Sequence, residues 1–155
     1  YILEKRLFDE GAIVVLLDGS TIRSGLSREL DHTPADRAEH LRRVAHVARI
    51  LNDQGIIAIC SFISPDENIR NQVAEIVGKE RFKLIYMDAD VDFSRKNRPA
   101  LWEKADRGEI ENMPGLDAAF EIPTSPALTL APENGESNCD IILEFLHQNK
   151  IYPLH

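Results

Sequence analysis

Two apolar runs constrain the fold of this chain more than any other feature of its sequence. Residues 12–17 and 56–62 are nearly continuous runs of apolar side chains. Runs without polar alternation are typical of strands covered on both faces, as in parallel sheets. Helical patterns separate the runs, so right-handed β-α-β connections are expected. The sequence therefore predicts an α/β fold, a three-layer α/β/α sandwich with a mainly parallel sheet.

The rest of the chain continues this alternation. Thr33-Pro34 is a strong helix start, an N-cap residue followed by proline at the first helical position. The opening helix lacks such a cap, so we expect the chain to be truncated at its N-terminus, inside a helix. The other expected elements are helices at 34–52, 65–77, 101–107 and 136–148, and strands at 82–87 and 127–130.

The composition narrows the classes of function. At 155 residues, 43% of them hydrophobic, the chain is expected to form one domain over residues 1–155. A formal net charge of −8 argues against nucleic acid or an anionic membrane surface as a partner. No apolar run is long enough to span a bilayer. Cys60 and Cys139 show no disulfide or metal spacing, and Cys60 is expected to be a buried thiol. We expect a cytoplasmic enzyme domain.

Asp18 stands where the first apolar run ends, in the segment Leu17-Asp18-Gly19-Ser20. The carboxyl ends of parallel strands form the crevice in which α/β folds bind ligands. An acidic residue there is placed to orient Mg²⁺ or to accept a proton from a substrate hydroxyl. The alternative is an ordinary Asp-Gly turn that closes the strand.

Two arginines follow this strand at positions suited to an anion. Arg23 comes five residues after Asp18, and Arg37 lies one turn before Leu41, on the apolar stripe of the expected helix at 34–52. Arg37 either extends outward to solvent or points into the crevice. If both guanidinium groups face one crevice, they form a site for a phosphate or sulfate.

The segment Ser61-Phe62-Ile63-Ser64-Pro65 ends the second apolar run and leads into the next helix. Helix N-termini offer free N–H groups and a favourable dipole to anions. Phe62 is placed to stack on a nucleobase, and Ser64 is expected to be the N-cap with Pro65 at the first helical position. The alternative is a capping serine beside a core phenylalanine.

Residues 96–122 are charged and interrupted by Pro99 and Pro114. Such a segment is typical of a mobile lid that excludes water during group transfer, the alternative being a solvated connection. The histidines show no metal-ligand spacing, and we expect them to be solvated or capping residues. They are His32, His40, His46, His147 and His155.

These motifs resemble those of the adenylylsulfate kinase family, in order and spacing, over nearly the whole chain. Asp18-Gly19…Arg23…Gly25-Leu26 is similar to that family's DGDNIRxGL. Residues 36–44 are similar to DRxENIRRV, residues 61–65 to SFISP, and residues 101–110 to LYKKARAGEI. The resemblance implies a P-loop kinase fold that phosphorylates the 3′-hydroxyl of adenosine 5′-phosphosulfate with ATP and Mg²⁺, giving PAPS in sulfate assimilation.

The resemblance also assigns roles to individual positions. Asp18 would be the catalytic residue, interacting with the substrate hydroxyl and with Mg²⁺. No set of metal-ligating residues is expected elsewhere in the chain. Arg23 and Arg37 would hold the phosphosulfate, while Met113 stands in the place of a stacking Phe. The implied substrate-binding positions are Arg23, Arg37, Phe62, Ile63, Ser64 and Met113.

This sequence also departs from the family pattern. The G-x-x-x-x-G-K-[ST] loop that would cradle the ATP phosphates is missing. Ser20 replaces an Asp, Glu111 a Lys and Met113 a Phe. Two hypotheses follow: a kinase whose P-loop precedes Tyr1, or a degenerate, non-catalytic nucleotide- or partner-binding domain attached to a sulfate-activating enzyme. Fusion to or association with an ATP sulfurylase, and a homodimer, are the partners that the sequence leaves open.

Overall fold

Strands and helices alternate along the chain, as the apolar runs predict. The structure, a computed structural model, describes residues 1–151. Its elements are α1 (Ile2–Asp9), β1 (Val14–Asp18), α2 (Gly19–Ser24), α3 (Pro34–Asp53), β2 (Ile57–Ser61), α4 (Glu67–Val77), β3 (Ile85–Met87), α5 (Val91–Asn97), α6 (Pro99–Asp106), β4 (Leu128–Leu130) and α7 (Gly135–Gln148). The α/β class is confirmed.

The strands pair in parallel, but in two separate sheets. β1 pairs with β2, from Val14 opposite Ile57 to Asp18 opposite Ser61, and β3 pairs with β4. Within residues 1–151, each strand therefore pairs along one edge only. The structure also corrects one expectation: Cys60, near the end of β2, is exposed rather than buried.

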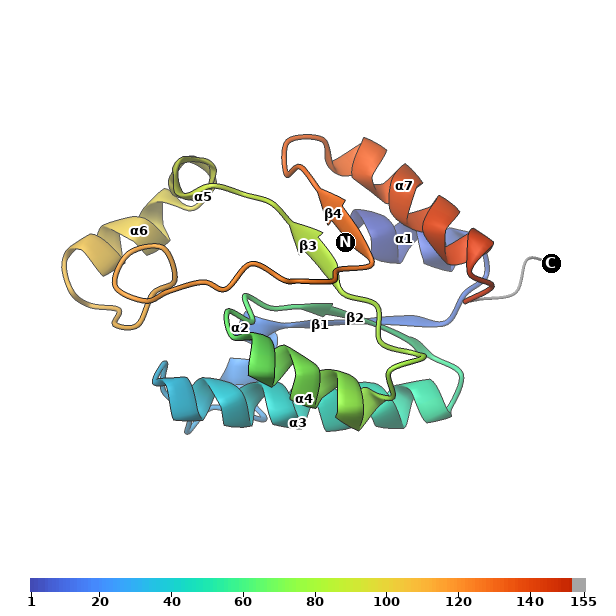
Figure 1. The fold of residues 1–155 in the computed structure, drawn as a ribbon, viewed down its shortest axis with the longest axis horizontal. Coiled ribbons are helices and arrows are strands. Elements are labelled where there is room, and N and C mark those ends of the chain that lie inside the picture. Colours follow the sequence, from blue (N-terminus) through green and yellow to red (C-terminus); the bar gives the residue numbers. More distant parts are fainter. Residues whose placement is uncertain (152–155) are drawn as a thin grey trace.

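Two layers of helices enclose the strands (Figure 1). α1 and α7 lie on one side, where Leu7 and Leu143 are buried against Val14 and Ile57. On the other side, α3 and α4 pack on the alternate strand positions, with Leu17 buried among Val44, Ala45, Ala48 and Val77. Neighbouring strand residues thus face opposite layers, as the two-residue period of a strand requires.

A third, smaller cluster holds together residues 96–122, here called the charged segment. Its buried residues are Trp102 and Ala105, both from α6, and Met113. α5 and α6 stand away from the two main layers, and residues 107–127 return from them to β4 (Figure 1). A short helix was predicted at 101–107 and is found as α6, whereas α5 was not predicted.

The start of α4 differs from the prediction. Ser64 is not its N-cap: the helix begins at Glu67, and the Asp66 side chain accepts a hydrogen bond from the N–H of Ile69 at 2.9 Å. Ser64 instead has a φ of 45°, a left-handed conformation that is uncommon for residues other than glycine. The Ser-Pro signal was therefore misinterpreted, because Pro65 belongs to the loop and the aspartate after it caps the helix.

Replacing Asp66 with alanine is expected to lower the free energy of unfolding by about 1 kcal/mol, the usual cost of losing an N-cap. Ser64→Ala should change it less, because the Ser64 side chain caps nothing. Urea denaturation of the two variants measures both values. An equal loss for the two substitutions would contradict this assignment of the cap.

Candidate ligand-binding site

Asp18 ends β1 opposite Ser61 and caps the short helix that follows. Its Oδ1 accepts hydrogen bonds from the N–H groups of Ser20 and Thr21, both at 3.0 Å. The hydroxyls of Ser20 (2.5 Å) and Thr21 (2.6 Å) also donate to its carboxylate. No helix was expected directly after Asp18, but these donors start α2. Asp18 is thus the N-cap of α2, a structural role that is compatible with a further role at the crevice.

These hydrogen bonds control the charge of Asp18. The hydroxyl of Ser20, followed by that of Thr21 and the backbone N–H groups, holds the pKa of Asp18 well below its usual range. A carboxylate with so low a pKa is a poor proton acceptor at neutral pH. As a fixed negative charge at the crevice, it is better suited to orient a hydroxyl or a cation than to remove a proton.

Replacing both Ser20 and Thr21 with alanine is expected to raise the pKa of Asp18 toward its unperturbed value of about 3.9, because two of its donors are lost. The stabilisation due to a lowered carboxylate pKa is present above the unfolded value and is lost as the pH falls through the folded one. The double variant should therefore lose it at a higher pH than the original protein. A ¹³C NMR titration of the Asp18 carboxyl carbon measures this shift; an unchanged midpoint would contradict the assignment.

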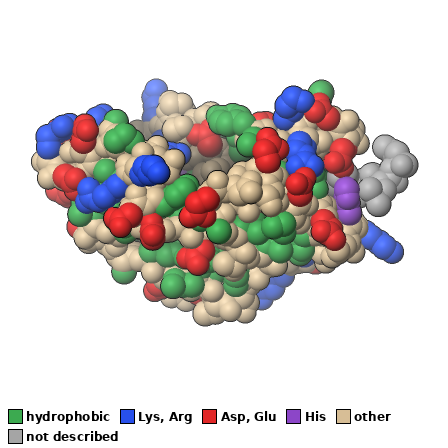
Figure 2. Space-filling view, turned by 90° about the horizontal axis from the view of Figure 1, so that it is seen from above, with side chains coloured by type: hydrophobic (Ala, Val, Ile, Leu, Met, Phe, Trp, Pro, Cys, Tyr) green, Lys and Arg blue, Asp and Glu red, His purple; other side chains and the backbone are tan. Residues whose placement is uncertain are grey.

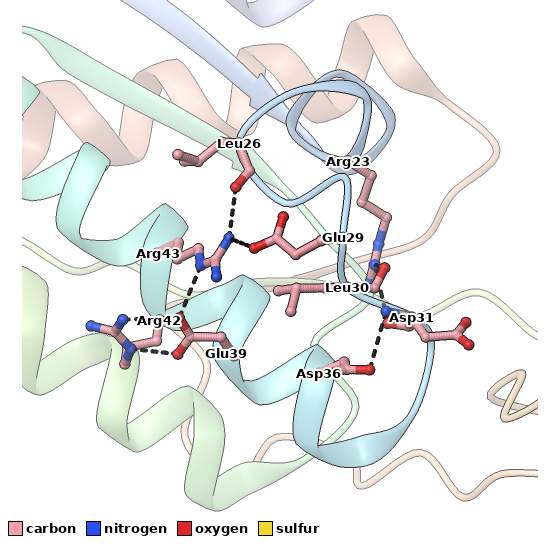
Figure 3. Close-up of polar contacts among 9 residues, drawn as sticks. All are labelled: Arg23, Leu26, Glu29, Leu30, Asp31, Asp36, Glu39, Arg42 and Arg43. Carbon is pink, nitrogen blue, oxygen red and sulfur yellow. Dashed lines mark hydrogen bonds and ion pairs between the residues drawn. The ribbon is translucent and has the colours of Figure 1, made fainter.

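Arg23 anchors the loop that joins α2 to α3. Its Nη1 donates to the carbonyl oxygens of Leu30 (3.1 Å) and Asp31 (3.2 Å), as Figure 3 shows. Arg43 holds the same loop from α3, donating to the Leu26 carbonyl at 2.7 Å and forming an ion pair with Glu29. The loop is thereby tied to both helices, which fixes the position of the Arg23 side chain.

Arg37 lies at a cavity between α3, the start of α4 and the charged segment. Its Nη2 donates to the carbonyl of Asn112 at 2.7 Å, across 75 positions of sequence. Of the two alternatives for this residue, the inward orientation is the one observed. The cavity has a volume of about 210 Å³, less than the roughly 300–1,000 Å³ of a complete ligand pocket. It is lined by His32, Pro34, Arg37, Pro65, Asp66, Ile69, Asn112, Pro114, Ala118, Ala119 and Glu121.

Arg23 and Arg37 differ from most arginines of this acidic chain. Among residues 1–151, neither forms an ion pair with a carboxylate, whereas Arg43, Arg70 and Arg81 do. Burial, and then the nearby charge of Arg23, lowers the pKa of Arg37. The two cations are therefore close enough to repel each other, and the Asp117 carboxylate, which forms no ion pair with Arg37, offsets this only in part. An anionic ligand would relieve this repulsion.

Elsewhere on the surface the two signs of charge are mixed. Figure 2 shows Asp and Glu side chains interspersed with Lys and Arg over the face seen from above. Most arginines among residues 1–151 form an ion pair with a carboxylate, whereas Arg23 and Arg37 do not.

Phe62 is half-buried and belongs to the cluster beneath α3. Its ring meets the His40 ring edge-on, with centroids 5.3 Å apart. His40 is buried, contrary to the expectation of a solvated histidine, and burial followed by the charge of Arg23 lowers its pKa to about 4. Its Nδ1 and the buried hydroxyl of Ser27 have no hydrogen-bond partner among the described residues. Phe62 thus has a packing role whether or not it also contacts a ligand.

The remaining predicted residues are not gathered at the cavity. Ile63 is 56% exposed, and Ser64 turns its carbonyl to Arg70, which donates to it at 2.6 Å. Met113 is 7% exposed and packs with Trp102, so it faces the small cluster rather than the cavity. The structure therefore brings Arg37 to the cavity and Arg23 near Arg37, while Met113 lies elsewhere.

Several residues around the cavity were missed by the sequence analysis. Asp117 accepts hydrogen bonds from the N–H groups of Asn112 (2.8 Å) and Met113, and so shapes the wall that Arg37 contacts. Arg70, 4% exposed, is buried behind the opposite wall. A signal for Arg70 was present, since it lies on the stripe of α4 that also carries Val73 and Val77.

No group of three His, Cys, Asp or Glu side chains suited to a metal ion occurs within the described part of the chain. Asp18 is a carboxylate at the crevice, where hydroxyl and amide donors hold it in place. The whole sequence contains no G-x-x-x-x-G-K-[ST] segment. In residues 1–151, no helix is both long and apolar enough to span a membrane.

The fold consists of parallel strands between two helical layers, and two arginines without an ion pair lie near the carboxyl ends of the strands. Such a domain is suited to a phosphorylated or sulfated ligand. A family model described as adenylylsulphate kinase matches residues 1–131. The adenylyl-sulfate kinase of Clostridium acetobutylicum is 40% identical over 152 residues, which are 96% of this chain and 76% of that protein. The chain therefore belongs to the adenylylsulfate kinase family, and the predicted resemblance is confirmed.

Solved structures and a longer relative agree with this assignment. The APS kinase CysC of Mycobacterium tuberculosis, solved in complex with AMPPNP and APS, superposes with a TM-score of 0.88 at 31% identity, over 94% of this chain and 87% of that one. The fold is accordingly that of a P-loop kinase. The bifunctional enzyme CysN/CysC of Rhodopirellula baltica is 36% identical over 147 residues, 93% of this chain but 23% of that enzyme.

Proposed function

We propose that this chain carries the substrate-binding part of an adenylylsulfate kinase, which transfers the ATP γ-phosphate to the 3′-hydroxyl of adenosine 5′-phosphosulfate. The observation that carries the proposal is the Arg23–Arg37 cluster: two cations near one crevice, neither paired with a carboxylate in residues 1–151. Family membership supports the reaction class. The Mycobacterium tuberculosis complex supports ATP as the donor and adenosine 5′-phosphosulfate as the acceptor.

In this proposal the chain acts by binding and orientation. Arg23 and Arg37 hold the phosphosulfate, and Asp18 orients the hydroxyl with its fixed charge. Phe62, Ile63 and Ser64 form the nucleoside side of the site. Phosphoryl transfer depends mainly on positioning and charge neutralisation. These contacts would therefore be sufficient to position the acceptor substrate and to neutralise its charge. Mg²⁺ would neutralise the transferred phosphate, held mainly by the nucleotide and water as is usual for this ion.

An ADP-release assay on the natural gene product tests the proposal. We expect ADP formation that depends on adenosine 5′-phosphosulfate, with adenosine 5′-phosphate, which lacks the sulfate, as the matched control. No substrate-dependent ADP would contradict the kinase function. The codons that precede Tyr1 give a second test, because a kinase requires a G-x-x-x-x-G-K-[ST] loop there.

The second candidate function is a non-catalytic binding domain attached to a sulfate-activating enzyme. It is favoured by Ser20, whose hydroxyl donates to Asp18 where the family has a second carboxylate, and by the burial of Met113. Tight binding of adenosine 5′-phosphosulfate without ADP formation would support this candidate.

The cellular partners also belong to the proposal. The bifunctional relative supports fusion to, or association with, a second sulfate-activating enzyme such as an ATP sulfurylase.

We further propose a cytoplasmic location and, as one oligomeric state to test, a homodimer. Size-exclusion chromatography with light scattering on the natural gene product measures that state.

A further inference from the structure

Arg70 is a buried cation beside the cavity. It lies on α4, next to Ile69, which lines the cavity, and only 4% of it is exposed. Burial of a charge is costly unless every donor finds a partner. The partners of Arg70 therefore indicate what it holds in place.

The guanidinium joins two segments that are far apart in the sequence. Its Nη1 donates to the carbonyl of Ser64 at 2.6 Å, and its Nη2 to the carbonyl of Glu121 at 2.7 Å. An ion pair with Glu67, to which Nε donates at 2.9 Å, neutralises its charge. The guanidinium carbon also lies 5.8 Å from the centroid of the Phe120 ring.

Further hydrogen bonds cross the same joint. The N–H of Glu121 donates to the carbonyl of Pro65 at 2.8 Å, and the N–H of Glu67 donates to the Glu121 carboxylate at 2.6 Å. The hydroxyl of Thr124 donates to Glu67 at 2.8 Å. Pro65 and Glu121 both line the cavity, so the joint connects two of its walls.

An ion pair that only stabilised α4 would need no more than Glu67, three residues away on the same helix. The two carbonyl contacts lie outside the helix, one in the loop after β2 and one in the segment that returns toward β4, orange in Figure 1. The Ser64 carbonyl belongs to a residue with a φ of 45°, whose conformation must be held by its surroundings. The planar guanidinium fork reaches both carbonyls at once, which a lysine cannot do.

We propose that Arg70 is a positioning residue that sets the distance between the 61–65 loop and residues 118–121, and thereby the shape of the acceptor cavity. The expected effect on binding of adenosine 5′-phosphosulfate depends on the function proposed above. The expected effect on the contact between the two walls does not.

The test uses Arg70→Lys in the natural gene product, which keeps the charge but loses the fork. We expect the KM for adenosine 5′-phosphosulfate to rise on the order of 10-fold or more, the value of a charged hydrogen bond, with the KM for ATP unchanged. We also expect faster hydrogen exchange at the amides of Glu67 and Glu121, measured without any ligand. Arg81→Lys is the matched control, since Arg81 is exposed and pairs with Asp53 away from the cavity.

Two results would overturn the proposal. Unchanged exchange at both amides would mean that Arg70 does not hold the walls together. Equal rises in both KM values, with a lower melting temperature, would mean that it is only structural. If the unsubstituted protein forms no ADP, the proposed function fails, and the exchange measurement still decides the role of Arg70.

Discussion

Replacing Arg37 with alanine is expected to weaken binding of adenosine 5′-phosphosulfate about 10- to 100-fold, the range for a lost hydrogen bond between charged groups, while ATP binding stays nearly unchanged. The guanidinium lies at the cavity, has no carboxylate partner in residues 1–151 and is partly buried. It is therefore a cation whose nearby carboxylate, that of Asp117, forms no ion pair with it and only partly offsets its burial and the charge of Arg23. Titration calorimetry with each ligand on the natural gene product measures the two affinities.

Arg42→Ala is the matched control for this substitution. Arg42 lies on the same helix and is 53% exposed, and its charge is already satisfied by Glu39. Removing an exposed pair of this kind should change the stability little and leave both affinities unchanged. If Arg37→Ala lowers the two affinities equally, Arg37 is structural or belongs to the ATP site. Arg37 would then not be part of a site for the phosphosulfate.

The elements that were correctly predicted are those with strong local signals. The helix expected at 34–52 is found at 34–53, because Thr33-Pro34 starts it and its apolar stripe packs on β1 and β2. The strand expected at 56–62 is found at 57–61. Both signals lie within the segment itself, so no knowledge of distant residues is needed to interpret them.

The errors occur where distant or competing contacts decide the structure. α2 was missed because Gly19-Ser20-Thr21 has a low helix propensity, and the helix depends on the Asp18 cap. The exposure of Cys60 depends on what covers its side of β2, which its own sequence does not specify. Asp66, rather than Ser64, caps α4, since Glu121 and Arg70 hold the loop before it.

The candidate site shows the same division. The position of Asp18 at the end of β1 could be predicted, because a strand end is a local property. That Arg37 contacts Asn112, and that Met113 turns away from the cavity, follows from how residues 107–118 fold onto Trp102. No periodicity records such a contact, so only the three-dimensional structure separates the residues of the cavity from their neighbours.

Replacing Trp102 with alanine is expected to unfold the charged segment locally while leaving the main domain folded. Trp102 is 3% exposed, its Nε1 donates to the hydroxyl of Ser94 at 3.0 Å, and its ring lies 4.3 Å from the Arg95 guanidinium carbon. Removing a buried tryptophan costs about 3–5 kcal/mol. Its cluster shares no buried residue with the two main clusters, so the loss should remain local.

Limited proteolysis measures this effect. Cleavage within residues 91–118 should accelerate about 100-fold or more if it follows the opening equilibrium, while the global melting temperature changes little. Leu7→Ala is the control, because Leu7 is fully buried in the main core and its loss should lower the melting temperature without selective cleavage of the segment. A large fall in melting temperature for Trp102→Ala would show that the segment is part of the main folding unit. It would then be too strongly coupled to the domain to open and close as a lid over the Arg37 cavity.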